Sequence, residues 1–120
     1  MIEELIAKVF CVRDCAHYAH WATSSGYHHE VLGGIYKQVI DYADRIMEAY
    51  IGNFNTVPVV KTEGCTFKDD KEILKCFEKD VVWIAEHRDH IAEGVEAIEA
   101  IIDELVEFYL SHIFKLKRLK

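Results

Sequence analysis

The sequence predicts an all-α protein, an up-down bundle of four helices with one long crossover between the second helix and the third. Apolar residues recur at steps of three and four over most of the chain, which is the period of helices with one buried face. Residues 52–68 interrupt this period with asparagine, proline and glycine. A chain of 120 residues also suits one domain, residues 1–120, which buries roughly two thirds of the surface exposed by its unfolded form.

The first two helices are predicted to form an antiparallel hairpin. We expect the first over residues 2–23 and the second from the cap and turn residues 23–26 to Ile51, where Gly52 and Asn53 end it. Both are about 35 Å long at 1.5 Å per residue, and the short turn reverses the chain direction. The apolar positions that define their buried faces are Leu5, Val9, Val12, Ala16 and Ala19, then Val31, Ile35, Val39, Ala43, Ile46 and Tyr50.

The crossover, residues 52–68, precedes a third helix that Asp69 and Glu72 are placed to cap. The apolar period then continues to residue 117 without a proline, and one unbroken helix of that length would be about 70 Å long. We therefore expect a break in the polar stretch 86–90 or at Gly94, which gives four helices. Without a break, the alternative is an extended dimer that resembles a coiled coil.

His20, His29, Asp44 and Glu48 are the candidate metal ligands. Imidazole together with carboxylate suits iron, manganese or zinc, whereas calcium and magnesium prefer oxygen ligands alone. His20 and His29 flank the predicted turn, so they can approach each other. His29 and Glu48 lie in one predicted helix, roughly 28 Å apart at 1.5 Å per residue, so a site containing both needs a second copy. The pattern therefore predicts a two-fold dimer through helix two.

The same residues resemble the starvation-induced mini-ferritins, the Dps-like proteins of the ferritin-like superfamily. The resemblance covers about residues 10–50: the pair His20-Trp21 near the end of the first helix, His29-Glu30 opening the second, and Asp44-x-x-x-Glu48 later in it. It implies a ferritin-like bundle in which the histidines come from one subunit and the carboxylates from its two-fold mate. Trp21 would pack beside the site. In the family an acidic ligand follows the second histidine by one turn, but Gly33 stands there in this chain.

The resemblance implies a function in iron handling. Sites shared between subunits would bind Fe(II), an oxidant would accept its electrons in a ferroxidase reaction, and Fe(III) would be stored inside a closed homo-oligomer such as a dodecamer. Zinc or manganese are alternative metals for the same ligands. The alternative function is a non-catalytic ferritin-like bundle that serves as a structural or partner-binding protein, because Gly33 removes a ligand. Gly33→Asp would then strengthen metal binding, unless glycine is needed there for close packing.

Other histidines offer weaker candidates for the metal site. His17 lies one turn before His20, and His28 is adjacent to His29, so both are secondary candidate ligands. His87 and His90 are expected to be turn residues, and His112 is expected at the surface. Single histidines and carboxylates on helices are also ordinary surface or core residues. Each candidate ligand therefore has an alternative interpretation in which it binds no metal.

The composition bears on partners and compartment. The net charge of −7 opposes binding to nucleic acid, so DNA is a disfavoured partner despite the basic residues Lys115, Lys117, Arg118 and Lys120, which also suit a helix C-terminus. The sequence contains no apolar run near the ~18 residues that a membrane span requires. The start of the chain, with Glu3 and Glu4, lacks the basic flank of a signal peptide. We therefore expect a cytoplasmic protein without a membrane partner.

Four cysteines occur at positions 11, 15, 65 and 76, without the spacing of a zinc finger or a Cys-x-x-Cys motif. In a reducing compartment they are expected to be free thiols. Cys11 and Cys15 are one turn apart on the first helix, where a small apolar side chain fills a core. Cys65 lies in the crossover and is the most accessible candidate for reactivity.

Overall fold

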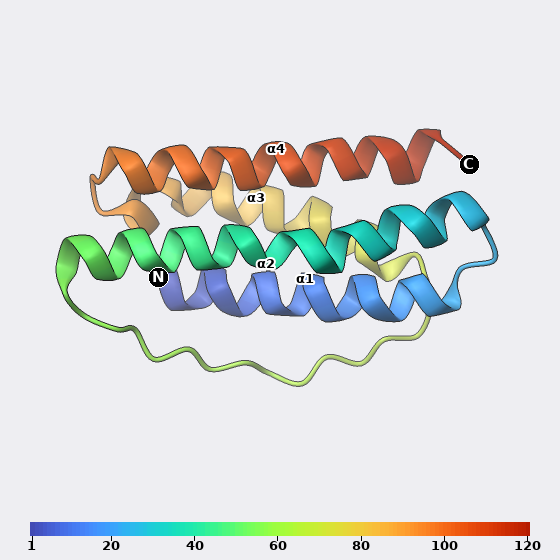
Figure 1. Cartoon of the computed structure of the whole chain (residues 1–120), viewed down its shortest axis with the longest axis horizontal. Coiled ribbons are helices and arrows are strands. Elements are labelled where there is room, and N and C mark those ends of the chain that lie inside the picture. The colour runs from blue at the N-terminus through green and yellow to red at the C-terminus, as the bar shows by residue number, and fades with distance from the viewer.

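The computed structural model describes all 120 residues and contains four helices and no strand, which confirms the predicted all-α, four-helix architecture. The helices are α1 (Ile2–Ala22), α2 (Gly26–Phe54), α3 (Glu72–Ala92) and α4 (Glu96–Arg118) (Figure 1). They form a bundle of 45 × 26 × 22 Å.

Each helix packs against two others. α1 contacts α2 and α3, and α4 contacts the same two helices, so the pairs α1/α4 and α2/α3 lie diagonally across the bundle. Figure 1 shows that every helix runs antiparallel to its two neighbours, because residues 55–71 return along the length of the bundle between the end of α2 and the start of α3. The α1–α2 turn and the C-terminus of α4 consequently lie at the same end.

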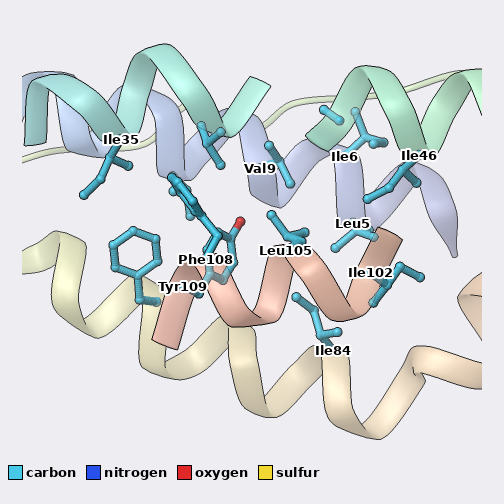
Figure 2. Packing of buried hydrophobic residues seen from close by; sticks show 14 of the residues in the cluster. Leu5, Ile6, Val9, Ile35, Ile46, Ile84, Ile102, Leu105, Phe108 and Tyr109 are labelled. Carbon is cyan, nitrogen blue, oxygen red and sulfur yellow. The ribbon is translucent and has the colours of Figure 1, made fainter. Parts of the chain in front are cut away.

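The core contains one cluster of apolar side chains drawn from all four helices, as the labelled residues in Figure 2 show. These side chains follow the helical period of the sequence, so each helix buries one face. The largest fully buried members are Leu5, Leu32, Ile35, Ile46, Ile73, Phe77, Ile84, Ile91, Ile98, Ile102, Leu105 and Tyr109.

The ends of the helices show where local sequence rules hold. Ser25 caps α2, since its hydroxyl accepts a hydrogen bond of 3.2 Å from the backbone N–H of His28. Asp69 accepts bonds of 2.8 and 3.1 Å from the N–H groups of Lys71 and Glu72 at the start of α3. The predicted end of the second helix at Ile51 is wrong by three residues: α2 continues to Phe54 and ends where Asn55 adopts a left-handed conformation with φ 51°.

The break between the last two helices lies at Gly94, one of the two predicted places. α3 continues through the polar stretch 86–90 to Ala92, and then Glu93 and Gly94 take φ values of 50° and 79°. Glycine adopts this region without steric cost, so it permits the sharp reversal. His87 and His90 are therefore helical and not turn residues, and the single long helix on which the coiled-coil alternative depended does not form.

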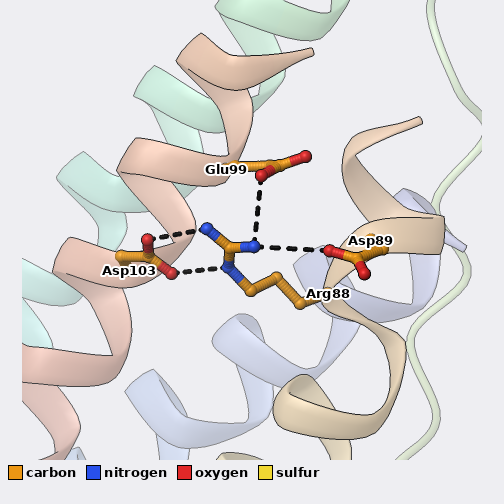
Figure 3. A network of polar contacts seen from close by, with 4 residues as sticks. All are labelled: Arg88, Asp89, Glu99 and Asp103. Carbon is orange, nitrogen blue, oxygen red and sulfur yellow. Dashed lines mark hydrogen bonds and ion pairs between the residues drawn. The ribbon is translucent and has the colours of Figure 1, made fainter. Parts of the chain in front are cut away.

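Arg88 joins α3 to α4 near this reversal (Figure 3). Its Nε and Nη2 donate to the two carboxylate oxygens of Asp103 at 2.7 and 2.8 Å, and Nη1 donates to Glu99 at 3.1 Å and Asp89 at 3.3 Å. The guanidinium holds the pKa of Asp103 below its usual value. Because Asp103 and Glu99 belong to α4, the Arg88 guanidinium ties the two helices together at this end.

The connection of residues 55–71 contains no helix or strand. It lies over α1, where Val60 and Phe67 pack against the core and Phe67 also stacks with Tyr18 of α1 at a ring-centroid distance of 6.0 Å. None of the four helices has the combined length and apolar character that crossing a membrane requires.

Candidate functional site

His20 and His29 meet at the end of the bundle where α1 turns into α2. The expected approach of the two side chains is confirmed, because their rings stack with centroids 3.7 Å apart and planes inclined by 18°. His20 belongs to the last turn of α1 and is half-buried, whereas His29 belongs to the first turn of α2 and is exposed. The two rings therefore bridge the helix hairpin.

Reciprocal hydrogen bonds orient both rings. Nδ1 of His20 lies 2.6 Å from the carbonyl oxygen of His29, and Nδ1 of His29 lies 2.7 Å from the carbonyl oxygen of His20. A carbonyl oxygen only accepts, so both Nδ1 atoms must donate. In a neutral imidazole the lone pair then resides on Nε2. This is the arrangement found in metal-binding histidines, whose second nitrogen donates to a carbonyl or carboxylate.

Gly33 provides the space in which the His20 ring lies. It is buried in α2, and a Cβ built at this position would lie 3.2 Å from Cε1 and 3.3 Å from Nδ1 of His20. The space beside Gly33, which a larger side chain would fill, is thus occupied by the His20 imidazole.

The secondary candidates have packing roles. The His17 ring stacks on Tyr36 at 4.0 Å and contacts Trp21 at 4.5 Å. Trp21 covers His17 and remains 69% exposed. Nε2 of His28 donates to the carbonyl oxygen of Leu119 at 2.8 Å, which ties the start of α2 to the end of α4.

Asp44 and Glu48 lie further along α2 from the histidine pair. Both are exposed and neither carboxylate forms an ion pair or hydrogen bond within the chain. No three side chains of histidine, cysteine, aspartate or glutamate converge in a metal-binding arrangement. One chain consequently offers two adjacent imidazoles at one place and two free carboxylates at another.

The other three histidines differ in their surroundings. His87 donates from Nδ1 to the carbonyl oxygen of Trp83 at 2.8 Å and stacks on its indole, while His90 is exposed. The expectation that His112 lies at the surface is wrong. Its ring is buried against Phe108, donates to the Phe108 carbonyl oxygen at 2.8 Å, and has a pKa lowered by burial.

The match to known proteins is at the level of a family. Residues 20–116 match a family of unknown function (DUF5856). The chain belongs to this family. No characterised protein and no solved structure matches it. The family segment includes all four candidate ligands and starts at His20, so most of α1 lies outside it.

The cysteines form contacts that the sequence did not predict. Sγ of Cys11 lies 2.6 Å from Sγ of Cys65, and burial raises the pKa of Cys11 to about 12. The Cys15 thiol lowers the pKa of the neighbouring Cys76. All four cysteines are free thiols, as expected. Only the spacing of Cys11 and Cys15 on one face of α1 could have indicated that thiols gather there.

Asp80 of α3 and Tyr109 of α4 add polar groups to the same interior. Asp80 is 7% exposed, and burial raises the pKa of its carboxyl to about 6 although Lys8 acts in the opposite direction. The Tyr109 hydroxyl is fully buried without a hydrogen-bond partner. Asp80 falls on the apolar stripe of α3, between Phe77 and Ile84, and that exception to the pattern is a signal available in the sequence.

Proposed function

We propose that this protein binds iron in the manner of a ferritin-like mini-ferritin, with His20 and His29 as ligands. The observation that carries the proposal is the pair of reciprocal bonds from Nδ1 to backbone carbonyl oxygens. These bonds select the tautomer in which Nε2 can coordinate a metal, and they orient both rings before the metal arrives. Adjacent neutral imidazoles suit Fe(II), and also Zn(II) or Mn(II).

The remaining ligands would come from a second copy. Asp44 and Glu48 are roughly 22 and 28 Å from His29 along α2 at 1.5 Å per residue, so they cannot reach the histidines of their own chain. An antiparallel two-fold pairing of α2 would bring the carboxylates of each copy toward the histidines of the other. The exposure of both carboxylates and their lack of partners within the chain support this arrangement.

The bundle supports the ferritin-like part of the proposal. A lengthwise connection between α2 and α3 places all neighbouring helices antiparallel, which is a topology used by ferritin-like bundles for sites between facing helices. In this scheme Fe(II) is the substrate. It gives one electron to an oxidant at the shared site, and Fe(III) is stored within a closed homo-oligomer.

The second candidate function is a bundle that binds a partner and performs no iron chemistry. The contact between Gly33 and His20 favours it, because His20 occupies the space beside Gly33 and no third histidine, cysteine, aspartate or glutamate completes a metal site within one chain. Under this alternative His20 and His29 only fasten the α1–α2 hairpin.

Metal binding by purified protein distinguishes the two functions. Titration calorimetry with Zn(II), and with Fe(II) without oxygen, should detect binding that weakens at least about tenfold in His29→Ala. His90→Ala is the matched control, since His90 is an exposed helical histidine and should leave binding unchanged. Equal affinity in the two variants would exclude His29 as a ligand. The Asp44→Ala, Glu48→Ala double variant should weaken binding too if copies share the site.

A further inference from the structure

Cys11 of α1 and Cys65 of the connection 55–71 are in direct contact although 54 residues separate them. Their sulfur atoms are 2.6 Å apart, so the two free thiols meet without any movement of the backbone. Cys65 is exposed and Cys11 is half-buried. An external reagent can therefore reach Cys65 first, with Cys11 directly behind it.

Few other interactions hold the connection in place. Residues 56–70 make no backbone–backbone hydrogen bond. Side chains provide the attachment, through the packing of Val60 and Phe67 and a long bond of 3.5 Å from the Tyr18 hydroxyl to the Lys68 carbonyl oxygen. A segment held in this way opens more readily than the helices beneath it.

Two hollows of about 550 and 540 Å³ flank the sulfur contact between α1 and the connection. Cys11 and Cys65 line both of them, together with Ala7 and Glu63. The thiol pair therefore lies on the boundary between the two hollows.

We propose that Cys11 and Cys65 are an oxidisable pair whose disulfide fastens the connection 55–71 to α1. A low-molecular-weight disulfide such as glutathione disulfide is the oxidant. The Cys65 thiolate attacks one of its sulfur atoms, forms a mixed disulfide and releases one thiolate. The Cys11 thiol then loses its proton to the solvent and attacks Sγ of Cys65, which releases the second thiolate. The two cysteines lose two electrons and two protons, and the reagent becomes two thiols.

The other two cysteines serve as an internal comparison. Cys15 is 1% exposed, so a soluble disulfide cannot reach it without opening the bundle, and Cys76 is half-buried beside it. The Cys15 thiol lowers the pKa of Cys76, which makes Cys76 the competing nucleophile. The proposal therefore requires that oxidation joins Cys11 to Cys65 before it involves Cys76.

Peptide mapping after oxidation with glutathione disulfide tests this order directly. Trypsin places the four cysteines on separate peptides, residues 9–13, 14–37, 62–68 and 76–79. We expect the protein to lose two hydrogen atoms in mass and to yield peptide 9–13 joined to peptide 62–68. Cys65→Ser should abolish this link, and the matched control Cys76→Ser should retain it. Dithiothreitol should restore the original peptides.

Native proteolysis provides a second readout. We expect trypsin to cleave the folded protein at the exposed Lys61, and oxidation should slow this cleavage about tenfold because the segment opens less often. After the same oxidation, Cys65→Ser should still be cleaved as fast as the protein with free thiols, because it cannot form the disulfide. A link between peptides 14–37 and 76–79, a disulfide between two chains, or a stable glutathione adduct on Cys65 without the cross-link would overturn the proposal.

Discussion

Gly33 of α2 and His20 of α1 are in such close contact that a Cβ at position 33 would lie 3.2 Å from the His20 ring. Most real Cβ contacts are longer, so a side chain there must displace the ring. His20 cannot yield freely, because it stacks on His29 and bonds to the His29 carbonyl oxygen. The histidine pair thus depends on a glycine in the neighbouring helix.

We predict that Gly33→Ala destabilises the protein while Gly34→Ala stabilises it. Both residues lie inside α2, and both substitutions reduce the backbone entropy of the unfolded chain, worth about 0.5–1 kcal/mol. At Gly34 the new Cβ meets only Nε2 of Gln38 at 3.5 Å, an ordinary contact. At Gly33 the overpacking of His20 should cost roughly 1–3 kcal/mol, which exceeds this gain. Urea unfolding of the two variants checks this, and equal stabilities would mean that His20 moves at no cost.

The same contact changes the expectation for Gly33→Asp. From sequence, this substitution restores an acidic ligand and strengthens metal binding. With His20 against position 33, we now expect Asp to push the ring from His29 and to lower the thermal midpoint without improving affinity for Zn(II). Calorimetry and thermal unfolding of one preparation would measure both effects. Tighter Zn(II) binding at an unchanged midpoint would show that the site accepts the carboxylate.

Asp80 should make stability depend on pH between about 4 and 6. Its folded-state pKa of about 6 exceeds the unfolded value of 3.8, so the folded protein binds more protons in this range and loses stability as pH rises. About two pKa units correspond to roughly 3 kcal/mol. His112 acts in the opposite sense, because burial lowers its pKa and stability falls as pH drops below 6.5.

Asp80→Asn should therefore flatten the decline between pH 4 and 6 and raise the stability at pH 7. The exposed Glu86 of α3, whose carboxylate has no bonded partner, offers the control Glu86→Gln. Urea unfolding across the pH series gives the profile. If the profile of Asp80→Asn matched that of the unmodified protein, Asp80 would not be the group that titrates.

Arg88→Lys should cost about 1 kcal/mol at low salt, because lysine cannot make the two parallel bonds that join Arg88 to Asp103. Asp103 is half exposed, so the loss should shrink in 1 M salt, where the Debye length is about 3 Å. The control is Arg45→Lys, since Arg45 makes a single exposed bond of 2.7 Å to Glu104 and should lose clearly less stability than Arg88→Lys. Chemical unfolding at two salt concentrations separates these cases.

A charge-reversing substitution on α2 tests whether the protein self-associates through this helix. If His29 of one copy meets Glu48 of the other, the two-fold axis passes near Gln38, and Lys37 of each copy faces Asp41 of its mate. Lys37→Glu should then raise the dimer dissociation constant at least about tenfold, because like charges meet. Sedimentation velocity measures this.

The control for self-association is Leu110→Ser on α4, where Leu110 is 50% and Phe114 54% exposed. This variant should leave an interface through α2 intact. Dissociation by Leu110→Ser with no effect of Lys37→Glu would move the interface to α4 and remove the shared metal site.

The repeating apolar positions of the sequence determined the four helices and their buried faces. Leu5 and Val9, for example, are four residues apart and therefore lie on the same face of a helix. Such spacing predicts both the helix and the face that it buries. Ser25, Asp69 and Gly94 act through hydrogen bonds or backbone angles within a few residues, and their positions were predictable for the same reason. The end of α2 was not predictable in this way, since the helix continues through Gly52 and Asn53 while the tilted rings of Tyr50 and Phe54 make contact with centroids 4.7 Å apart.

Contacts between helices were decided only by the tertiary structure. The sequence placed His20 and His29 beside one turn, but the stacking of their rings and the contact with Gly33 depend on how α1 packs against α2. The contact of Cys11 with Cys65 depends on the course of the connection over α1. No periodic pattern encodes such pairs, because their members are distant in sequence and the relative placement of the helices arises from the packing of the whole core.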